Sequence, residues 1–230
     1  MPELLDNPIW NALSTEHYNF AIGDGMARRY PPEIGPLSGL AEQTAAAYEA
    51  LRAITSIDGI AAQFLELPPE IRPGWELVRE GLMSQMIWSG GHSPGPRPLP
   101  AQSALRLLTA ADVPAMVELA ELTEPGPFRT RTHELGEFFG IFEAGKLMAM
   151  AGQRTRLSGF IEVSAVCTHP DARGRGYARA AMTAVMDDIL RRGSVPMLHV
   201  FAANTSAIRV YEGLGFQHRR SLHLAVLKPV

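Results

Sequence analysis

The eleven-residue segment Thr168–Ala178, THPDARGRGYA, constrains the fold of this chain more than any other stretch. It places a proline and two glycines between an apolar, β-prone run and an alanine-rich run. Proline ends a strand because it cannot donate to the strand ladder. Apolar residues then recur at helical spacing, at Ala178, Ala181, Met182, Val185, Met186, Ile189 and Leu190. The segment therefore predicts a strand, a tight turn and an amphipathic helix in direct succession.

This predicted turn is suited to holding an anion. The first N–H groups of a helix have no partner within the helix, and the positive end of the helix dipole lies behind them. A phosphate can accept hydrogen bonds there if side chains leave room. Gly174, Gly176 and Ala178 leave that room, and three arginines, Arg173, Arg175 and Arg179, add positive charge. The alternative is a strand-to-helix turn that carries only a solvated basic surface.

Two other phosphate-binding motifs fit the segment less well. A Walker loop requires Gly-Lys-Ser or Gly-Lys-Thr, which the segment lacks. A dinucleotide-binding turn requires a third glycine or alanine and an acidic residue about 20 residues further on. Here the nearest later acids are Asp187 and Asp188, and the preceding β-α-β context is missing.

The pattern from residue 104 to the end predicts an α/β fold. Strands and helices are expected in the order β-α-loop-β-β-β-α-β-α-β, which favours a mixed sheet with helices on its faces. The expected strands are 105–108, 138–142, 146–153, 160–168, 197–201 and a terminal one, and the expected helices are 112–122, 177–192 and 205–212.

The segment 89–103, SGGHSPGPRPLPAQS, holds four prolines and three glycines and is typical of a linker. It divides the chain into residues 1–88 and 104–230. The first part is expected to be an accessory α/β module, with a helix over 37–54, a hairpin over 19–29 and strands over 59–67 and 82–88. The last of these segments could equally be helical.

Composition excludes several classes of protein. The 230 residues carry a net charge of −3, which argues against a general nucleic-acid binder. No apolar window is long enough to span a membrane, and the acidic N-terminus lacks a secretory signal, so we expect a cytoplasmic protein. Cys167 has no second cysteine with which to pair. His133, His169 and His199 lack the spacing of metal ligands, so no metal is expected.

Two blocks of sequence resemble one known family. Arg173-x-x-Gly176-x-Ala178 is similar to the Arg/Gln-x-x-Gly-x-Gly/Ala signature of the GNAT superfamily of acetyl-CoA-dependent N-acyltransferases. Residues 204–216, NTSAIRVYEGLGF, resemble the Asn-x-x-Ala-x-x-x-Tyr-x-x-x-Gly-Phe element of the same family. The resemblance covers about residues 104–230 and is closest to the glycine-N-acyltransferase-like branch.

The resemblance implies a mixed, mostly antiparallel central sheet flanked by helices, and acetyl-CoA as cosubstrate. It implies that Tyr211 is the general acid and that Asn204 bonds the pantetheine arm or positions the next helix. The pantetheine arm would pair with the main chain of Val166, Cys167 and Thr168, where the strand separates from its neighbour. The pyrophosphate would lie on the turn formed by Arg173, Gly174, Arg175, Gly176, Tyr177 and Ala178.

The sequence does not single out one residue as the general base. Glu162 has the spacing of the base in the histone-acetylating members of the superfamily, and partial burial is expected to raise its pKa toward neutrality. A strand-edge carboxylate facing solvent is the alternative reading. Other candidates are Glu134, His133 and His199. Cys167 is expected to be a packed residue rather than an acyl-carrying nucleophile.

The expected activity is transfer of an acetyl group to a primary amine of a small molecule, by direct attack in a ternary complex. In the loop 123–136, Arg129, Arg131 and His133 could meet an acidic group such as an amino-acid carboxylate, or could simply be solvated. The first half of the chain is expected to be a degenerate half-GNAT that helps to wall the acceptor pocket. We expect a monomer or homodimer. The rival hypothesis is a catalytically silent sensor of acyl-CoA.

Overall fold

The computed structural model describes residues 3–90 and 99–230. Its helices are α1 (Pro8–Ser14), α2 (Ala45–Ala53), α3 (Val113–Thr123), α4 (Tyr177–Arg191) and α5 (Thr205–Glu212). Its strands are β1 (Ala27–Arg29), β2 (Ser38–Leu40), β3 (Ala61–Leu65), β4 (Trp75–Trp88), β5 (Ser103–Leu107), β6 (Phe138–Glu143), β7 (Lys146–Leu157), β8 (Phe160–Thr168), β9 (Val195–Phe201) and β10 (Phe216–Pro229). Short 3₁₀ turns include η2 (Tyr18–Phe20), η4 (Thr132–Leu135) and η5 (Pro170–Ala172).

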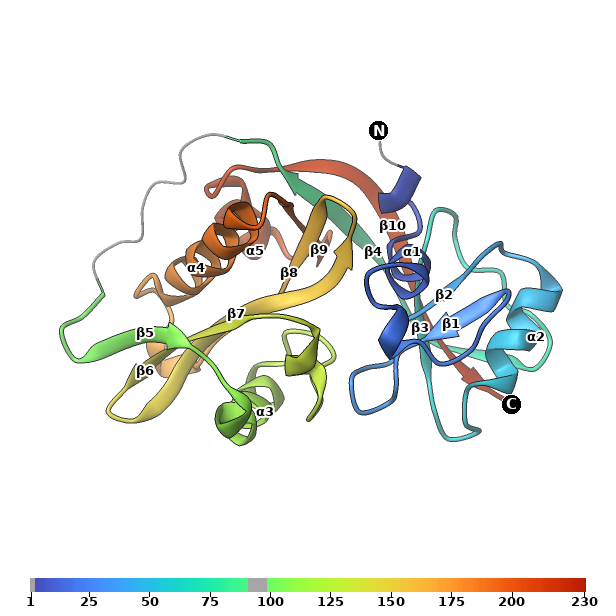
Figure 1. Cartoon of the computed structure of the whole chain (residues 1–230), viewed down its shortest axis with the longest axis horizontal. Helices are drawn as coiled ribbons and strands as arrows, with labels where there is room; N and C mark the ends of the chain where they lie inside the picture. The colour runs from blue at the N-terminus through green and yellow to red at the C-terminus, as the bar shows by residue number, and fades with distance from the viewer. Residues whose placement is uncertain (1–2, 91–98) are drawn as a thin grey trace.

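One large mixed sheet organises these elements (Figure 1). In the described residues it has eight strands in the order β3-β10-β4-β9-β8-β7-β6-β5. Neighbouring strands are antiparallel except β8 and β9, which are parallel. The predicted mixed, mostly antiparallel sheet with flanking helices is therefore confirmed.

Both halves of the chain contribute to this sheet. β3 and β4 come from the first 88 residues, and β4 pairs with β9 on one side and with β10 on the other. The segment 82–88 is thus a strand, not a helix. The division into residues 1–88 and 104–230 stays a prediction, and most of the predicted linker, residues 91–98, lies outside the described residues.

The predicted helix over 37–54 is wrong in its first part. Ser38–Leu40 forms β2, which pairs with β1, and the helix begins only after Thr44, whose hydroxyl accepts from the Ala47 amide. The main chain of Gly39 packs closely against that of Trp10 in α1, where a side chain would clash. This tertiary contact and the Thr44 cap place the helix start later than the alanine content alone indicates.

Helices cover both faces of the sheet. Ile161, Val163 and Val166 of β8 pack with α4, whereas Ala165 and Cys167 pack with α3 on the other face. Glu162 lies between Ile161 and Val163, so its side chain points away from α4. Hydrophobic residues of α1 cover this second face beside the strands of the N-terminal half.

β8 and β9 separate after a short parallel ladder. The last paired residues are Glu162 and Met197, while β8 continues to Thr168 and β9 continues to Phe201. A bulge marks the separation, because Met150 pairs with Cys167 but Gly152 pairs with Ser164. Its extra residue, Ala165, has a φ of 50°. The predicted gap between the two strands is therefore present.

Candidate active site

Within the described residues, the turn between β8 and α4 presents a row of main-chain N–H groups without hydrogen-bond partners. Gly174 and Gly176 have φ values of 78° and 82°, in the left-handed region that favours glycine. No hydrogen bond is recorded within the described residues for the main-chain N–H groups of residues 174–179. They lie just before and within the first turn of the 15-residue helix α4, whose dipole adds a positive potential at the same place. The turn has the chemistry of a phosphate site.

A pocket of about 470 Å³ lies over this turn. Its lining joins the end of β8, the turn and α5: Thr168, Ala172, Arg173, Gly174, Gly176, Tyr177, Ala178, Arg179, Arg209 and Val210. Arg209, from α5, is a cationic wall residue that the motif analysis did not single out. A Cβ built on Gly174 meets nothing within 4 Å, so the space above it is open.

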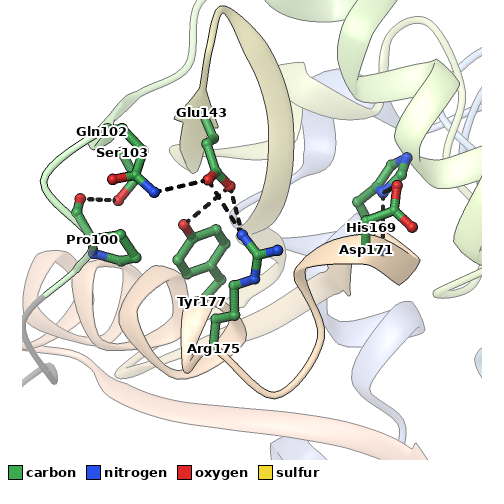
Figure 2. A network of polar contacts seen from close by, with 8 residues as sticks. All are labelled: Pro100, Gln102, Ser103, Glu143, His169, Asp171, Arg175 and Tyr177. Carbon is green, nitrogen blue, oxygen red and sulfur yellow. Dashed lines mark hydrogen bonds and ion pairs between the residues drawn. The ribbon is translucent and has the colours of Figure 1, made fainter.

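Two of the predicted cofactor-binding side chains are engaged elsewhere (Figure 2). The guanidinium of Arg175 lies 3.0 Å from the Glu143 carboxylate at the end of β6. Tyr177 is buried, and its hydroxyl donates to the same carboxylate at 3.3 Å. These contacts tie the β6–β7 hairpin to the turn. Arg175 and Tyr177 therefore offer the site their main chain rather than their side chains.

The outer half of β8 has one free edge. Val166, Cys167 and Thr168 lie beyond the last β9 pair, so among the described strands only β7 pairs with this part of β8. Cys167 is buried, and burial raises the pKa of its thiol to about 11. At neutral pH this thiol is protonated and a poor nucleophile.

Asn204 and Tyr211 lie at the two ends of α5. The Asn204 side chain accepts from the Ala207 amide at 3.2 Å and from the Ser206 hydroxyl at 3.0 Å, so it caps the helix. The Tyr211 ring packs edge-on to Phe216 with ring centres 6.4 Å apart. Burial raises the pKa of Tyr211 to about 12, which keeps the phenol protonated at neutral pH.

The expectation for the pKa of Glu162 is wrong. Its side chain is fully buried, and burial alone would raise the pKa. Electrostatic attraction and hydrogen bonds from Arg154 and His199, each 2.6 Å away, outweigh burial and hold the pKa of Glu162 below its usual range. Glu162 is therefore an ionised member of a buried cluster.

The cluster extends into the N-terminal half. His199 contacts Gln85 of β4 at 3.0 Å through Nε2, and its ring stacks on Phe64 of β3 at 4.5 Å. Neither Arg154 nor Gln85 was predicted from the sequence to belong to the site. The Ser158-Gly159 hairpin between β7 and β8 offered a signal for Arg154, since it places that residue near Glu162. Nothing local pointed to Gln85.

The remaining base candidates are engaged in local contacts. Glu134 is paired with Arg131 at 2.7 Å, and His133 contacts the Thr130 carbonyl at 3.0 Å. Across residues 3–90 and 99–230, no three His, Cys, Asp or Glu side chains cluster in a way that could hold a metal ion. None of the helices described is both long and apolar enough to cross a membrane.

Comparison with known proteins identifies the class. A sequence model of the FR47-like protein family matches residues 138–224. A GNAT-family protein from Novosphingobium aromaticivorans is 35% identical over 100% of both chains, with a TM-score of 0.90. The chain therefore belongs to the GNAT family. No curated protein matched the sequence.

More distant structures share the fold alone. A GCN5-related N-acetyltransferase from Kribbella flavida is 15% identical over 95% of both chains, with a TM-score of 0.65. A tandem GNAT protein from the clavulanic acid biosynthesis pathway is 18% identical over 87% of this chain and 77% of its own, with a TM-score of 0.59.

Proposed function

We propose that the protein transfers an acetyl group from acetyl-CoA to a primary amine of a small molecule, by direct attack within a ternary complex. The observation that carries this proposal is the row of N–H groups at residues 174–179, which have no partner in the described part of the chain, beside the edge of β8 that β9 leaves open. A pyrophosphate would accept hydrogen bonds from these N–H groups. The amides of a pantetheine arm would pair with the open edge of β8.

The turn fits coenzyme A in charge as well as shape. Arg173, Arg179 and Arg209 line the pocket over the open space at Gly174. Arg179 also donates to the Gly213 carbonyl at 3.0 Å, which holds α4 against the end of α5. Val166, Cys167 and Thr168 would pair with the arm through their main chain, while Asn204 would fix the start of α5.

Tyr211 is proposed as the general acid. Acetyl-CoA supplies the thioester, whose acetyl carbon bonds the amine nitrogen while the carbon–sulfur bond breaks. The Tyr211 hydroxyl gives its proton to the departing thiolate, and the proton that the amine loses returns to the phenolate through solvent. Main-chain N–H groups at the strand gap would stabilise the charge that develops on the carbonyl oxygen.

Glu162 is better suited to positioning than to proton abstraction. A carboxylate with a lowered pKa is a weak base, and this one is already bonded to Arg154 and His199. We propose that it fixes β9 against β8 at the closed end of the gap. No side chain is assigned as the base.

The experiment that tests the proposal is a screen for release of coenzyme A from acetyl-CoA in the presence of amino acids, polyamines, aminoglycosides and peptides. We expect release that depends on one class of amine. Thermal stabilisation by acetyl-CoA with no release from any amine would instead support the acyl-CoA sensor.

A further inference from the structure

A second pocket, of about 460 Å³, lies between the two halves of the chain. Glu16, His17 and Phe20, around η2, line one side, and residues 133–138, which include the end of η4, line the other. Two contacts join the two halves of the chain next to the pocket. The Arg131 amide donates to the Glu33 carbonyl at 3.0 Å, and the Thr132 hydroxyl donates to the Ile34 carbonyl at 2.6 Å.

The pocket lies close to the gap between β8 and β9. Phe138, in its wall, pairs with Gly152 of β7, and Gly152 pairs with Ser164 of β8. Ser164 follows the last residue pair between β8 and β9. Two strand spacings, about 10 Å, therefore separate the Phe138 wall from the gap. Phe138 packs with Ala165 and Cys167, so the pocket lies on the α3 face, which is also the face of Glu162.

Arg156 is the pocket residue whose positive charge has no acidic partner within the described residues. Its Nε is buried without a hydrogen-bond partner, and its Nη2 reaches only the amide oxygen of Gln153, at 3.5 Å. No acidic side chain pairs with Arg156 within the described residues, whereas the other arginine in the wall, Arg192, bonds Asp188 at 2.7 Å. A buried guanidinium N–H without an acceptor is costly, and a carboxylate is the acceptor that its planar fork fits best.

Carboxylates line the same pocket. Glu16 is exposed and has no recorded ion pair in the described part of the chain, and Glu134 and Glu137 lie in the opposite wall. His17 does not add positive charge, because burial and the nearby Arg156 charge lower the pKa of its ring to about 4. Glu134 and Glu137 are bonded to Arg131 and Arg192, so within the described residues the pocket offers the carboxylate of Glu16 for an ammonium and the guanidinium of Arg156 for an anion.

We infer that this pocket holds the acceptor, and that the acceptor is a free amino acid or a similar small molecule in which a primary amine lies near a carboxylate bound by Arg156. This inference rests on the proposed acetyl transfer. Arg156 takes the place of Arg129, Arg131 and His133, the residues that the sequence offered for such a carboxylate; of these, Arg131 is bonded to Glu134. The N-terminal half then supplies one wall of the acceptor site.

The test compares free α-amino acids with amines that lack only the carboxylate, for example phenylalanine with phenethylamine. For each compound, kcat and KM are measured by release of coenzyme A, and binding of acetyl-CoA is measured separately by calorimetry. We expect the amino acids to have kcat/KM values about 10- to 100-fold higher than their partners, the effect of one charge-assisted contact.

Arg156→Gln should remove this preference by raising KM for the amino acids about 10- to 100-fold, with little change in KM for the amines. Arg156→Lys should restore part of the preference for amino acids. Arg191→Gln, at an exposed arginine outside the pocket, is the matched control and should keep the preference. Equal use of both compound series, or an unchanged preference in Arg156→Gln, would overturn the inference while leaving acetyl transfer intact. Failure to bind acetyl-CoA at all would overturn the proposed function itself.

Discussion

The carboxylate of Glu162 on β8 lies 2.6 Å from Nδ1 of His199 on β9, at the closed end of the gap between the two strands. Arg154 of β7 binds the same carboxylate, and Gln85 of β4 binds the other side of His199. One buried cluster thus connects four adjacent strands, of which β4 comes from the N-terminal half. The separation of β8 and β9 is held in place by both halves of the chain.

Removing the charge of Glu162 should destabilise the fold. Glu162→Gln leaves Arg154 and His199 without their anion in a buried place, and the free energy of unfolding should fall by about 3–5 kcal/mol. Urea unfolding at pH 7 measures this. Glu134→Gln, in the more exposed pair with Arg131, is the control and should change stability by less than about 1 kcal/mol. Equal effects of the two substitutions would show that the cluster has no special role.

The same variant should respond differently to acid. The pKa of Glu162 is lower in the folded protein than its ordinary 4.5, so its contribution is fully present above pH 4.5 and is lost as the pH falls through the folded value. The stability difference between the parent and Glu162→Gln should therefore narrow below pH 4.5. A difference that stays constant down to pH 3 would contradict the lowered pKa.

His17 should make stability depend on pH in a separate window. Burial lowers the pKa of this ring from 6.5 to about 4, so its contribution to stability is fully present above pH 6.5 and falls progressively as the pH drops toward 4. The loss over this window should be about 3 kcal/mol, and His17→Gln should lack it. Urea unfolding between pH 7 and pH 4.5 measures the slope. His133→Gln, at a partly exposed histidine, should keep the parent slope.

Tyr211→Phe should separate turnover from binding. Loss of the proposed proton donor should lower kcat about 100-fold or more, while the Kd for acetyl-CoA changes less than about threefold. Tyr177→Phe is the matched control, because that hydroxyl is bonded to Glu143 and should leave kcat nearly unchanged. If Tyr211→Phe retained full kcat, another group would have to protonate the thiolate.

A methyl group at Gly174 should interfere with the ligand more than with the fold. Gly174 and Gly159 have nearly the same positive φ, 78° and 77°, and a Cβ at either meets nothing within 4 Å. Alanine at either position should therefore cost a similar amount of stability, about 1 kcal/mol. Only Gly174→Ala should raise the Kd for acetyl-CoA, by about tenfold or more. Equal Kd values for the two variants would place the pyrophosphate elsewhere.

The turn could be predicted because its causes are local. Pro170, Gly174 and Gly176 set the main-chain path within a few residues, and the helix that follows carries its own periodicity. The family resemblance then indicated where the neighbouring strands separate. Main-chain features of the site were therefore within reach of sequence reasoning.

The environments of the side chains could not be predicted from the sequence, because they depend on partners that are distant in sequence. Arg175 is bound by Glu143, 32 positions away, and Glu162 by His199, 37 positions away. Glu162 is buried more completely than expected, but the sign of its pKa shift was set by Arg154 and His199. The alanine content of 37–54 likewise indicated a longer helix than the contact between Gly39 and Trp10 allows.

A crystal structure of the complex with coenzyme A would decide whether the turn before α4 holds the pyrophosphate. We predict pyrophosphate oxygens about 2.9 Å from main-chain nitrogens within residues 174–179, with the pantetheine arm between β8 and β9. A complex with coenzyme A bound away from the turn, or no binding at millimolar concentration, would contradict it.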